Sequence, residues 1–287
     1  MNKKKSLWVF VATAPKCSFA TIEMLNSLLR YSENIDVSLT LSVQNSYDHN
    51  LLKSKFPKAD FFYPSLVRIT SLKDKPRYRS AIHSEILNQA WARKPKSDFA
   101  FIGDNDIYIQ EIASLQEIFS YLENNNLKAI GTSYPSNNLL QRILGRDNEK
   151  PLNVPNCIFC ILDLNYYRKF SNICNFADRL FFSDNPLFDN NQDPRIRNKM
   201  IDSGSLIYTS ILKENKRFIA IKCKNTFHPY FPASIKHFLL GGPLSPEIYI
   251  NHEPLIIIHH FKKLSLNTFR DHKSLENAYR IWIKNFQ

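Results

Sequence analysis

The chain has 287 residues, of which 44% are hydrophobic and 13% are aromatic, so it can bury a core and is not a disordered polymer. Its 6 glycines argue against a glycine-rich nucleotide loop as the organising motif. The excess of 38 basic over 26 acidic side chains gives a net charge of +12. That charge favours nucleic acid, acidic lipid headgroups or phosphorylated small molecules as partners, although a lysine-rich genomic bias would produce it as well.

The cysteines argue against a disulfide framework, because there are five of them in a long chain. Cys157 and Cys160 have the spacing of a zinc-binding pair, but no second such pair and no nearby histidine pair completes four ligands. We interpret them as buried free thiols, which suits a reducing compartment.

The first 17 residues combine a lysine run with a short apolar stretch, which fits either a signal peptide or a first strand. Pro15 and Lys16 interrupt any cleavage site, so we favour the strand. No apolar run approaches the ~20 residues that a membrane-spanning helix requires.

Strand-like and helix-like segments alternate along the chain. The predicted strands cover residues 7–13, 35–43, 61–63, 99–103, 127–131, 154–164, 218–222 and 255–258. The predicted helices cover residues 18–32, 79–93, 115–124, 165–170, 203–214 and 267–287, and the predicted loops cover 137–150 and 178–198. This alternation predicts an open, mostly parallel α/β sheet flanked by helices, with its ligand beyond the carboxyl ends of the strands.

Two aspartates, Asp104 and Asp106, directly follow the strand predicted at 99–103. Like charges this close together cost free energy unless a cation lies between them. Mg²⁺ and Mn²⁺ prefer carboxylate oxygens as ligands, so the pair is a candidate metal site. An isolated Asp-x-Asp also fits a solvated turn, and the surrounding sequence has to decide between the two.

The stretch SAIHSEILNQAWARKPKSDFAFIGDNDIYI, residues 80–109, resembles the donor-binding core of GT-A glycosyltransferases, especially family 2-like ones. The matching positions are His83, Leu87, Asn88, Asp104 and Asp106, then Asp202 and Gly204 in an Asp-x-Gly before a helix, and finally His260 and Ser265, with His259 as the neighbouring option. Two positions depart from the family pattern. Gln44, Asn45 and Ser46 stand where a base-gripping acidic signature is usual, and Ser84 replaces a glycine.

The resemblance implies a GT-A (Rossmann-like) fold with a C-terminal helical extension, and a nucleotide-sugar donor held through its diphosphate by Mn²⁺ or Mg²⁺. It implies Asp104, Asp106 and His260 as metal ligands, and Asp202 as the base of an inverting transfer. The implied donor contacts are Ala12, Thr13, Asn45, Arg79, His83, Asn105 and Gly204. Three of these residues also have ordinary structural explanations: Asp202 as a helix N-cap, His260 as a strand-end histidine, and Arg79 as a solvated surface charge.

The expected organisation is a catalytic domain over residues 1–265 and an amphipathic tail over 266–287. Apolar tail residues fall toward one side, namely Leu275, Ala278, Ile281, Trp282 and Phe286. The tail can pack on the domain or lie on an anionic bilayer. We expect a cytoplasmic enzyme, peripheral on the inner membrane face, whose acceptor is a glycan or glycolipid of bacterial surface polysaccharide or lipopolysaccharide.

Two other functions fit parts of the sequence. A nucleotidyltransferase also uses paired carboxylates, but it would need a third carboxylate and phosphate-gripping glycines. A basic module that binds nucleic acid or an acidic polymer fits the charge, but the basic residues are scattered along the chain. We therefore expect no nucleic-acid partner.

Overall fold

A computed structural model describes residues 4–67, 70, 78–93, 96–133, 155, 157–173, 204–221, 223–226, 247–252, 256–261, 272–284 and 287. The predicted loops at 137–150 and 178–198, together with Asp202, Ser265 and Phe286, lie outside these residues.

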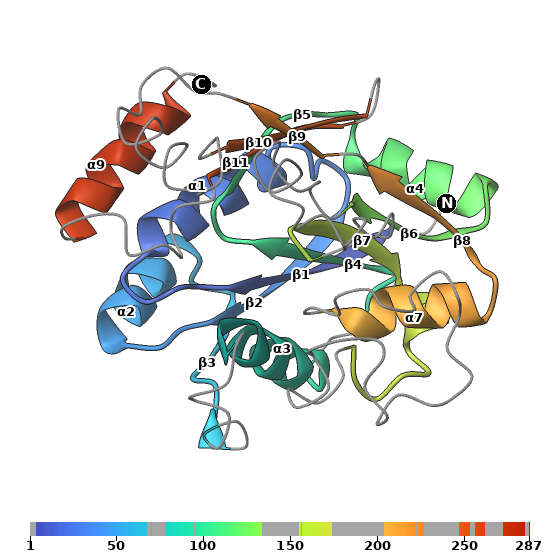
Figure 1. Cartoon of the computed structure of the whole chain (residues 1–287), viewed down its shortest axis with the longest axis horizontal. Coiled ribbons are helices and arrows are strands. Elements are labelled where there is room, and N and C mark those ends of the chain that lie inside the picture. Colours follow the sequence, from blue (N-terminus) through green and yellow to red (C-terminus); the bar gives the residue numbers. More distant parts are fainter. Residues whose placement is uncertain are drawn as a thin grey trace, which may run out of the picture.

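In the part of the chain that the structure describes, the larger of two sheets has seven strands in the order β3-β2-β1-β4-β7-β6-β8 (Figure 1). These strands are β1 (Ser6–Ala12), β2 (Asp36–Ser42), β3 (Asp60–Phe62), β4 (Phe99–Asp104), β6 (Leu127–Thr132), β7 (Phe159–Asp163) and β8 (Arg217–Ile221). Only β7 runs antiparallel to its neighbours, β4 and β6. The prediction of an open, mostly parallel α/β sheet is confirmed.

Helices cover both faces of this sheet, with α3 and α7 on one side in Figure 1 and α1 and α4 on the other. The helices of this domain are α1 (Ser18–Leu29), α2 (Ser46–Lys55), α3 (Tyr78–Trp91), α4 (Leu115–Asn124), α6 (Leu164–Tyr167) and α7 (Ser205–Lys213). Because side chains alternate along a strand, Trp8 of β1 packs with Trp91 of α3, whereas Val9 joins the core that contains Met24 of α1. A central strand covered on both faces must be apolar throughout, which explains the run LWVFV and confirms the strand interpretation of this segment.

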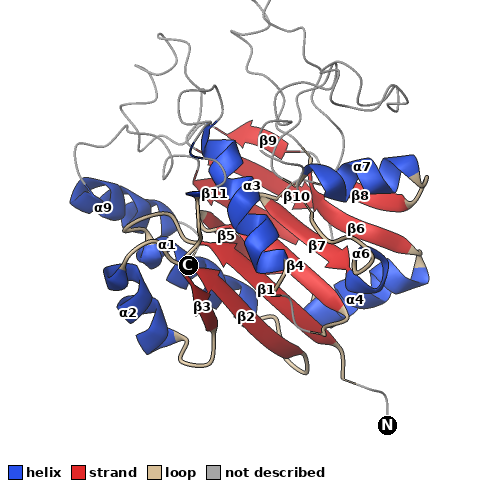
Figure 2. Ribbon diagram, turned by 90° about the horizontal axis from the view of Figure 1, so that it is seen from below, coloured by secondary structure: helices blue, strands red, loops and turns tan. Residues whose placement is uncertain are grey.

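The second sheet is antiparallel, with the strand order β5-β11-β10-β9 (Figure 2). Its strands are β5 (Ile107–Ile112), β9 (Cys223–Thr226), β10 (Glu247–His252) and β11 (Ile256–Phe261). The sequence did not predict this sheet, nor α2. Polar residues interrupt β9 and β10, and β5 finds its partner strand nearly 150 residues later, so no local pattern marks the pairing.

Several predicted boundaries differ from the observed ones by a few residues, among them the following. β11 ends at Phe261 and not at Ile258, so His259 and His260 lie within it, because β11 stays paired with β10 as far as Phe261. β7 begins at Phe159, five residues later than predicted. Helix α7 begins at Ser205 with Gly204 at its N-cap position, so the N-cap is not Asp202.

The C-terminal helix α9 (His272–Ile283) packs on the domain. Tyr279 and Trp282 make ring contacts with Phe261 of β11, and Tyr279 also contacts Phe19 of α1. The assignment of Ile281 to the apolar side was wrong: it is 56% exposed, because the buried stripe at helical spacing includes Leu275, Tyr279, Trp282 and Ile283. Among the described helices, none is long and apolar enough to cross a bilayer.

Candidate metal and donor site

The carboxyl ends of three adjacent parallel strands meet at one edge of the large sheet. Ala12, the last residue of β1, pairs with Ser42 of β2 on one side and with Asp104 of β4 on the other. The amide of Thr13 donates to the carbonyl of Ser42 at 3.2 Å, which continues this alignment beyond the strand. This edge is where open α/β sheets bind their ligands, and it carries three predicted site residues: Ala12, Thr13 and Asp104.

The turn after β4 is tied to a distant strand. After Asp104 the chain turns into β5, and β5 pairs with β11 so that Ile107 lies opposite His260. The amide of Phe261 also donates to the carbonyl of Asp106, at 2.8 Å. The second sheet thereby brings a histidine to a pair of aspartates about 150 residues earlier in the chain.

Asp104, Asp106 and His260 present one ligand atom each, and these atoms all lie within 4.8 Å of one another. The Nε2 atom of His260 is 3.1 Å from Oδ1 of Asp106 and 3.9 Å from Oδ2 of Asp104. Asp106 and His260 are buried, whereas the Asp104 side chain is 29% exposed. Two carboxylates and an imidazole nitrogen that converge on one point, open on one side, fit a single divalent cation of the Mn²⁺ or Mg²⁺ class.

The two neighbouring histidines, His259 and His260, point in different directions. Because side chains alternate along β11, His259 points away from the aspartates, and its Nε2 lies 2.6 Å from Oε1 of Gln110. Of the two, only His260 reaches the carboxylates.

Helix α3 brings a second histidine to the cluster. The Nε2 atom of His83 is 3.9 Å from Oδ1 of Asp104, and its side chain is partly exposed. Arg79 lies one turn earlier on the same helix. The amide oxygen of Asn88 accepts from the backbone of Ile173, so this residue of the motif has a structural partner.

Thr13 and Asn105, both predicted to contact the donor, belong to a buried chain of hydrogen bonds that joins the turn after β4 to helix α1. The Asn105 amide donates to the hydroxyl of Thr21 at 3.4 Å, and that hydroxyl donates to the hydroxyl of Thr13 at 3.2 Å. Both predicted residues are buried, so their side chains hold the turn and the loop after β1 against the helix.

Asn45 and Gly204 also have structural partners. Asn45 is the N-cap of α2: its side chain accepts from the amide of Asp48 and donates to the carboxylate of the same residue. Gly204 has a φ of +77°, and a Cβ atom there would lie 2.3 Å from Sγ of Cys157. This position therefore requires glycine for both its backbone conformation and its packing.

The buried thiol of Cys17 is held neutral. Burial raises the pKa of Cys17 to about 12, helped by the negative charges of Asp106 and Asp48. Cys17, Cys157 and Cys160 are buried and lie outside any disulfide, which agrees with the interpretation of Cys157 and Cys160 as buried thiols.

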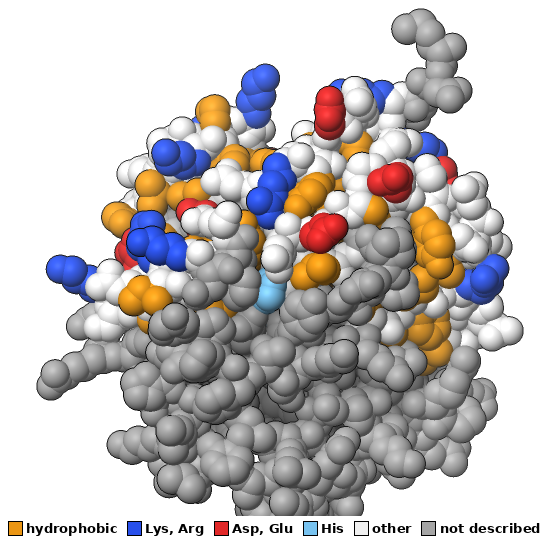
Figure 3. All heavy atoms as spheres, turned by 90° about the horizontal axis from the view of Figure 1, so that it is seen from above, with side chains coloured by type: hydrophobic (Ala, Val, Ile, Leu, Met, Phe, Trp, Pro, Cys, Tyr) orange, Lys and Arg blue, Asp and Glu red, His pale blue; other side chains and the backbone are white. Residues whose placement is uncertain are grey.

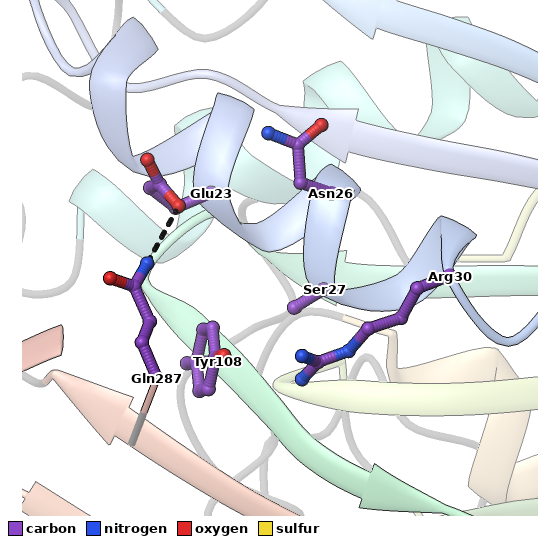
Figure 4. A pocket seen from close by; sticks show the side chains of 6 residues that line it. All are labelled: Glu23, Asn26, Ser27, Arg30, Tyr108 and Gln287. Atoms are coloured by element: carbon purple, nitrogen blue, oxygen red, sulfur yellow. Dashed lines mark hydrogen bonds between the residues drawn. The ribbon is translucent and has the colours of Figure 1, made fainter. Parts of the chain in front are cut away.

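A separate hollow of about 190 Å³ lies between α1 and β5 (Figure 4). It is lined by Glu23, Asn26, Ser27, Arg30, Tyr108 and Gln287, none of which is a predicted site residue. The Arg30 guanidinium already donates to the backbone carbonyls of Ile109 and Gln110, and Gln287 donates to Glu23. We assign no ligand to this hollow.

No family model matches the chain, and no curated protein matches it. Among solved structures, galactosyltransferase LgtC in complex with donor and acceptor sugar analogs has a TM-score of 0.51 at 8% identity, over 97% of this chain and 95% of that one. Mouse xyloside xylosyltransferase 1 has a TM-score of 0.46 at 11% identity, over 88% and 96% of the two chains. Mannosyltransferase PcManGT from Pyrobaculum calidifontis, solved with GDP-Man and Mn²⁺, has a TM-score of 0.45 at 10% identity, over 76% of this chain. The chain spans 55% of the length of that mannosyltransferase.

At such low identity the likeness to LgtC concerns architecture alone, and it extends over nearly the whole of both chains. The mostly parallel sheet, the Asp-x-Asp turn at its carboxyl-end edge and this likeness agree with one another. The chain has the GT-A glycosyltransferase fold.

Proposed function

We propose that this protein is a metal-dependent glycosyltransferase that moves a sugar from a nucleotide-sugar donor to a glycan or lipid-linked acceptor. The observation that carries the proposal is the convergence of Asp104, Asp106 and His260 at the ligand-binding edge of the sheet. Asp104 comes from the large sheet, Asp106 from the turn after it and His260 from the second sheet, and an isolated solvated turn would not require the histidine.

Asp104, Asp106 and His260 would hold the metal ion. When bound, the ion would neutralise the charge that develops on the departing nucleoside diphosphate. His83 lies beside Asp104, and both side chains are partly exposed. The His83 imidazole can therefore donate a hydrogen bond to an oxygen atom of the nucleotide sugar. Ala12, Thr13, Asn45, Arg79, Asn105 and Gly204 complete the proposed donor site, and the two buried side chains, Thr13 and Asn105, act by fixing the backbone around them.

The acceptor side of the proposal rests on the sequence. Asp202 stands two residues before the glycine that opens α7, and we propose it as the base that accepts the proton of the attacking hydroxyl in an inverting transfer. The anomeric configuration of the product, followed by proton NMR from the first minutes of reaction, tests the inversion. A product with the donor's configuration contradicts it.

We also propose a bacterial surface polysaccharide or lipopolysaccharide as the acceptor class, reached by peripheral contact with the inner membrane face. The outer face of α9 supports this placement, because Lys273, Arg280, Ile281 and Lys284 are exposed there. Elsewhere, Figure 3 shows lysine and arginine side chains interspersed with acidic ones on one face of the described part, and not gathered into a single patch.

Nucleotide binding that requires the metal ion tests the proposed donor site. With Mn²⁺ present, a nucleoside diphosphate from a panel of bases should raise the melting temperature of the wild-type protein, and chelation of the metal should remove the shift. Asp104→Asn and Asp106→Asn should abolish the shift, since each removes a carboxylate charge from the site while its volume is kept.

Glu111→Gln is the matched control, because this exposed acid lies on β5 and outside the cluster. It should bind nucleotide like the wild type. Binding of nucleic acid that weakens with salt and ignores both aspartate substitutions would overturn the proposal in favour of a basic binding module.

A further inference from the structure

The connection from β1 to α1, together with the first residue of α1, covers residues 13–18 and is called loop 13–18 below; it contains a left-handed residue and begins beside the candidate metal site. It follows Ala12, whose neighbour across the sheet is Asp104. The amide of Cys17 donates to the carbonyl of Ala14, which closes a turn, and Lys16 within that turn has a φ of +60°. A left-handed conformation costs free energy for any residue other than glycine, and it persists only where surrounding contacts enforce it.

The enforcing contact is a carboxylate from another helix. Asp48 of α2 is 0% exposed, and it accepts hydrogen bonds from the amide of Lys16 at 2.6 Å and from the amide of Ser18 at 3.3 Å. The side-chain amide of Asn45 donates to the same carboxylate at 2.5 Å. Among the described residues, no lysine, arginine or histidine forms an ion pair with this buried carboxylate, and its side-chain partners there are the hydrogen-bond donors of Lys16, Ser18 and Asn45.

Asp48 also completes the beginning of α1. The N-cap residue of that helix is Cys17, whose side chain makes no capping hydrogen bond. Asp48 supplies the missing acceptor from outside the helix, at Ser18, the first helical residue, where the helix dipole favours a negative charge.

The strained turn is connected to both acidic groups by hydrogen bonds. Asp48 accepts from the amides of Lys16 and Ser18, and Thr13, at the start of the loop, is joined through Thr21 to Asn105, the neighbour of Asp106. Lys16 is exposed on this loop, and no ion pair of its ammonium group is recorded among the described residues. An ammonium group beside a site for a metal-bound diphosphate has the charge to contact phosphate oxygens.

We propose that Asp48 is a positioning residue for the nucleotide donor: it locks loop 13–18 in its strained form, so that the loop backbone and the Lys16 ammonium face the donor's anionic diphosphate. The inference rests on the proposed transferase function. It assigns Asp48 a role that the Asp-x-Asp motif does not contain, and it explains why a buried charge is kept on a helix with no part in the metal cluster.

The experiment measures nucleotide and metal affinity separately. UDP and GDP are titrated by calorimetry onto protein loaded with Mn²⁺, and Mn²⁺ alone is titrated with detection by electron paramagnetic resonance. Asp48→Asn should weaken nucleotide binding by roughly tenfold and leave Mn²⁺ affinity within about twofold, because it displaces the loop and spares the ligands. In turnover, KM for the donor should rise more than kcat falls.

Lys16→Gly provides a second test that does not depend on the stability of Asp48→Asn. Glycine tolerates the left-handed φ, so the variant should fold at least as stably as the wild type and still lose nucleotide affinity, and Lys16→Arg should restore it. Asp36→Asn, an exposed position on β2, is the control and should change neither affinity.

Two outcomes overturn the inference and can be told apart. If Asp48→Asn lowers the melting temperature while its nucleotide affinity, and that of Lys16→Gly, equals the wild-type value, Asp48 is only a structural cap and the transferase proposal survives. If the wild-type protein binds no nucleoside diphosphate with Mn²⁺ present, the proposed function fails and this inference fails with it.

Discussion

The candidate site depends on single side chains whose direction is set by strand pleating. On β11, His260 turns toward Asp104 and Asp106, and its neighbour His259 turns toward Gln110 on the other face. Both histidines are 6% exposed, so burial does not distinguish them. Only orientation does, and a one-residue shift in the pairing of β11 with β5 would exchange them.

The neighbouring histidines therefore form a matched pair for mutation. His260→Ala should remove one of the three proposed metal ligands and lower Mn²⁺ affinity by at least about tenfold, since even loss of an outer-shell partner of a ligand costs that much. His259→Ala loses its hydrogen bond with Gln110 and should cost stability while Mn²⁺ affinity stays near the wild-type value. Direct titration of Mn²⁺ measures both, and equal affinities in the two variants would contradict the assignment of His260.

At the scale of elements, most helices and strands follow from local patterns. Helix α4 occupies the predicted residues because Ser114 and Glu117 form a capping box, and β1, β2 and β4 are the expected apolar runs. Helix α7 shows the limit of such reasoning. An aspartate before a helical pattern predicts a cap at Asp202, but the helix begins after Gly204, where a left-handed glycine fits against Cys157.

Gly204→Ala should destabilise the protein by about 1–3 kcal/mol, from backbone strain at positive φ and from a Cβ contact of 2.3 Å with Sγ of Cys157. In a Cys157→Ala background the contact with sulfur is absent and the strain remains, so the same substitution should cost less, about 1 kcal/mol. Urea unfolding of the wild type, the two single variants and the double variant measures the free energy of unfolding of each and hence the difference between the two costs. An equal cost in both backgrounds would show that the sulfur contact contributes nothing.

At the scale of the whole molecule, three packed regions meet around the site. The large sheet supplies Asp104, the second sheet supplies His260, and α9 packs on Phe261, the residue after that histidine. The C-terminal helix therefore shares one apolar cluster with Phe261, next to the candidate metal site. Of the two placements expected for the tail, on the domain or on a bilayer, the structure shows packing on the domain.

Two adjacent residues of α9 test the docking. Trp282 is 1% exposed and Ile281 is 56% exposed. Trp282→Ala should reduce the free energy of unfolding by about 3–5 kcal/mol, as for other large buried side chains, whereas Ile281→Ala should stay within about 0.5 kcal/mol of the wild type. Chemical denaturation measures both. Similar small effects would show that the helix is not docked in solution.

The sequence alone determined the α/β class, most of the elements of the large sheet, and the position of Asp104 and Asp106 at the end of a buried strand, because these features depend on local periodicity and on residues close together in the chain. Only the tertiary structure decided which histidine joins them and that a second sheet exists. It also decided that Asp48, which no motif marked, is a buried charge that shapes the loop after β1. Pairing between strands that lie far apart along the chain and the satisfaction of buried charges are properties of the assembled fold, and no local pattern encodes either of them.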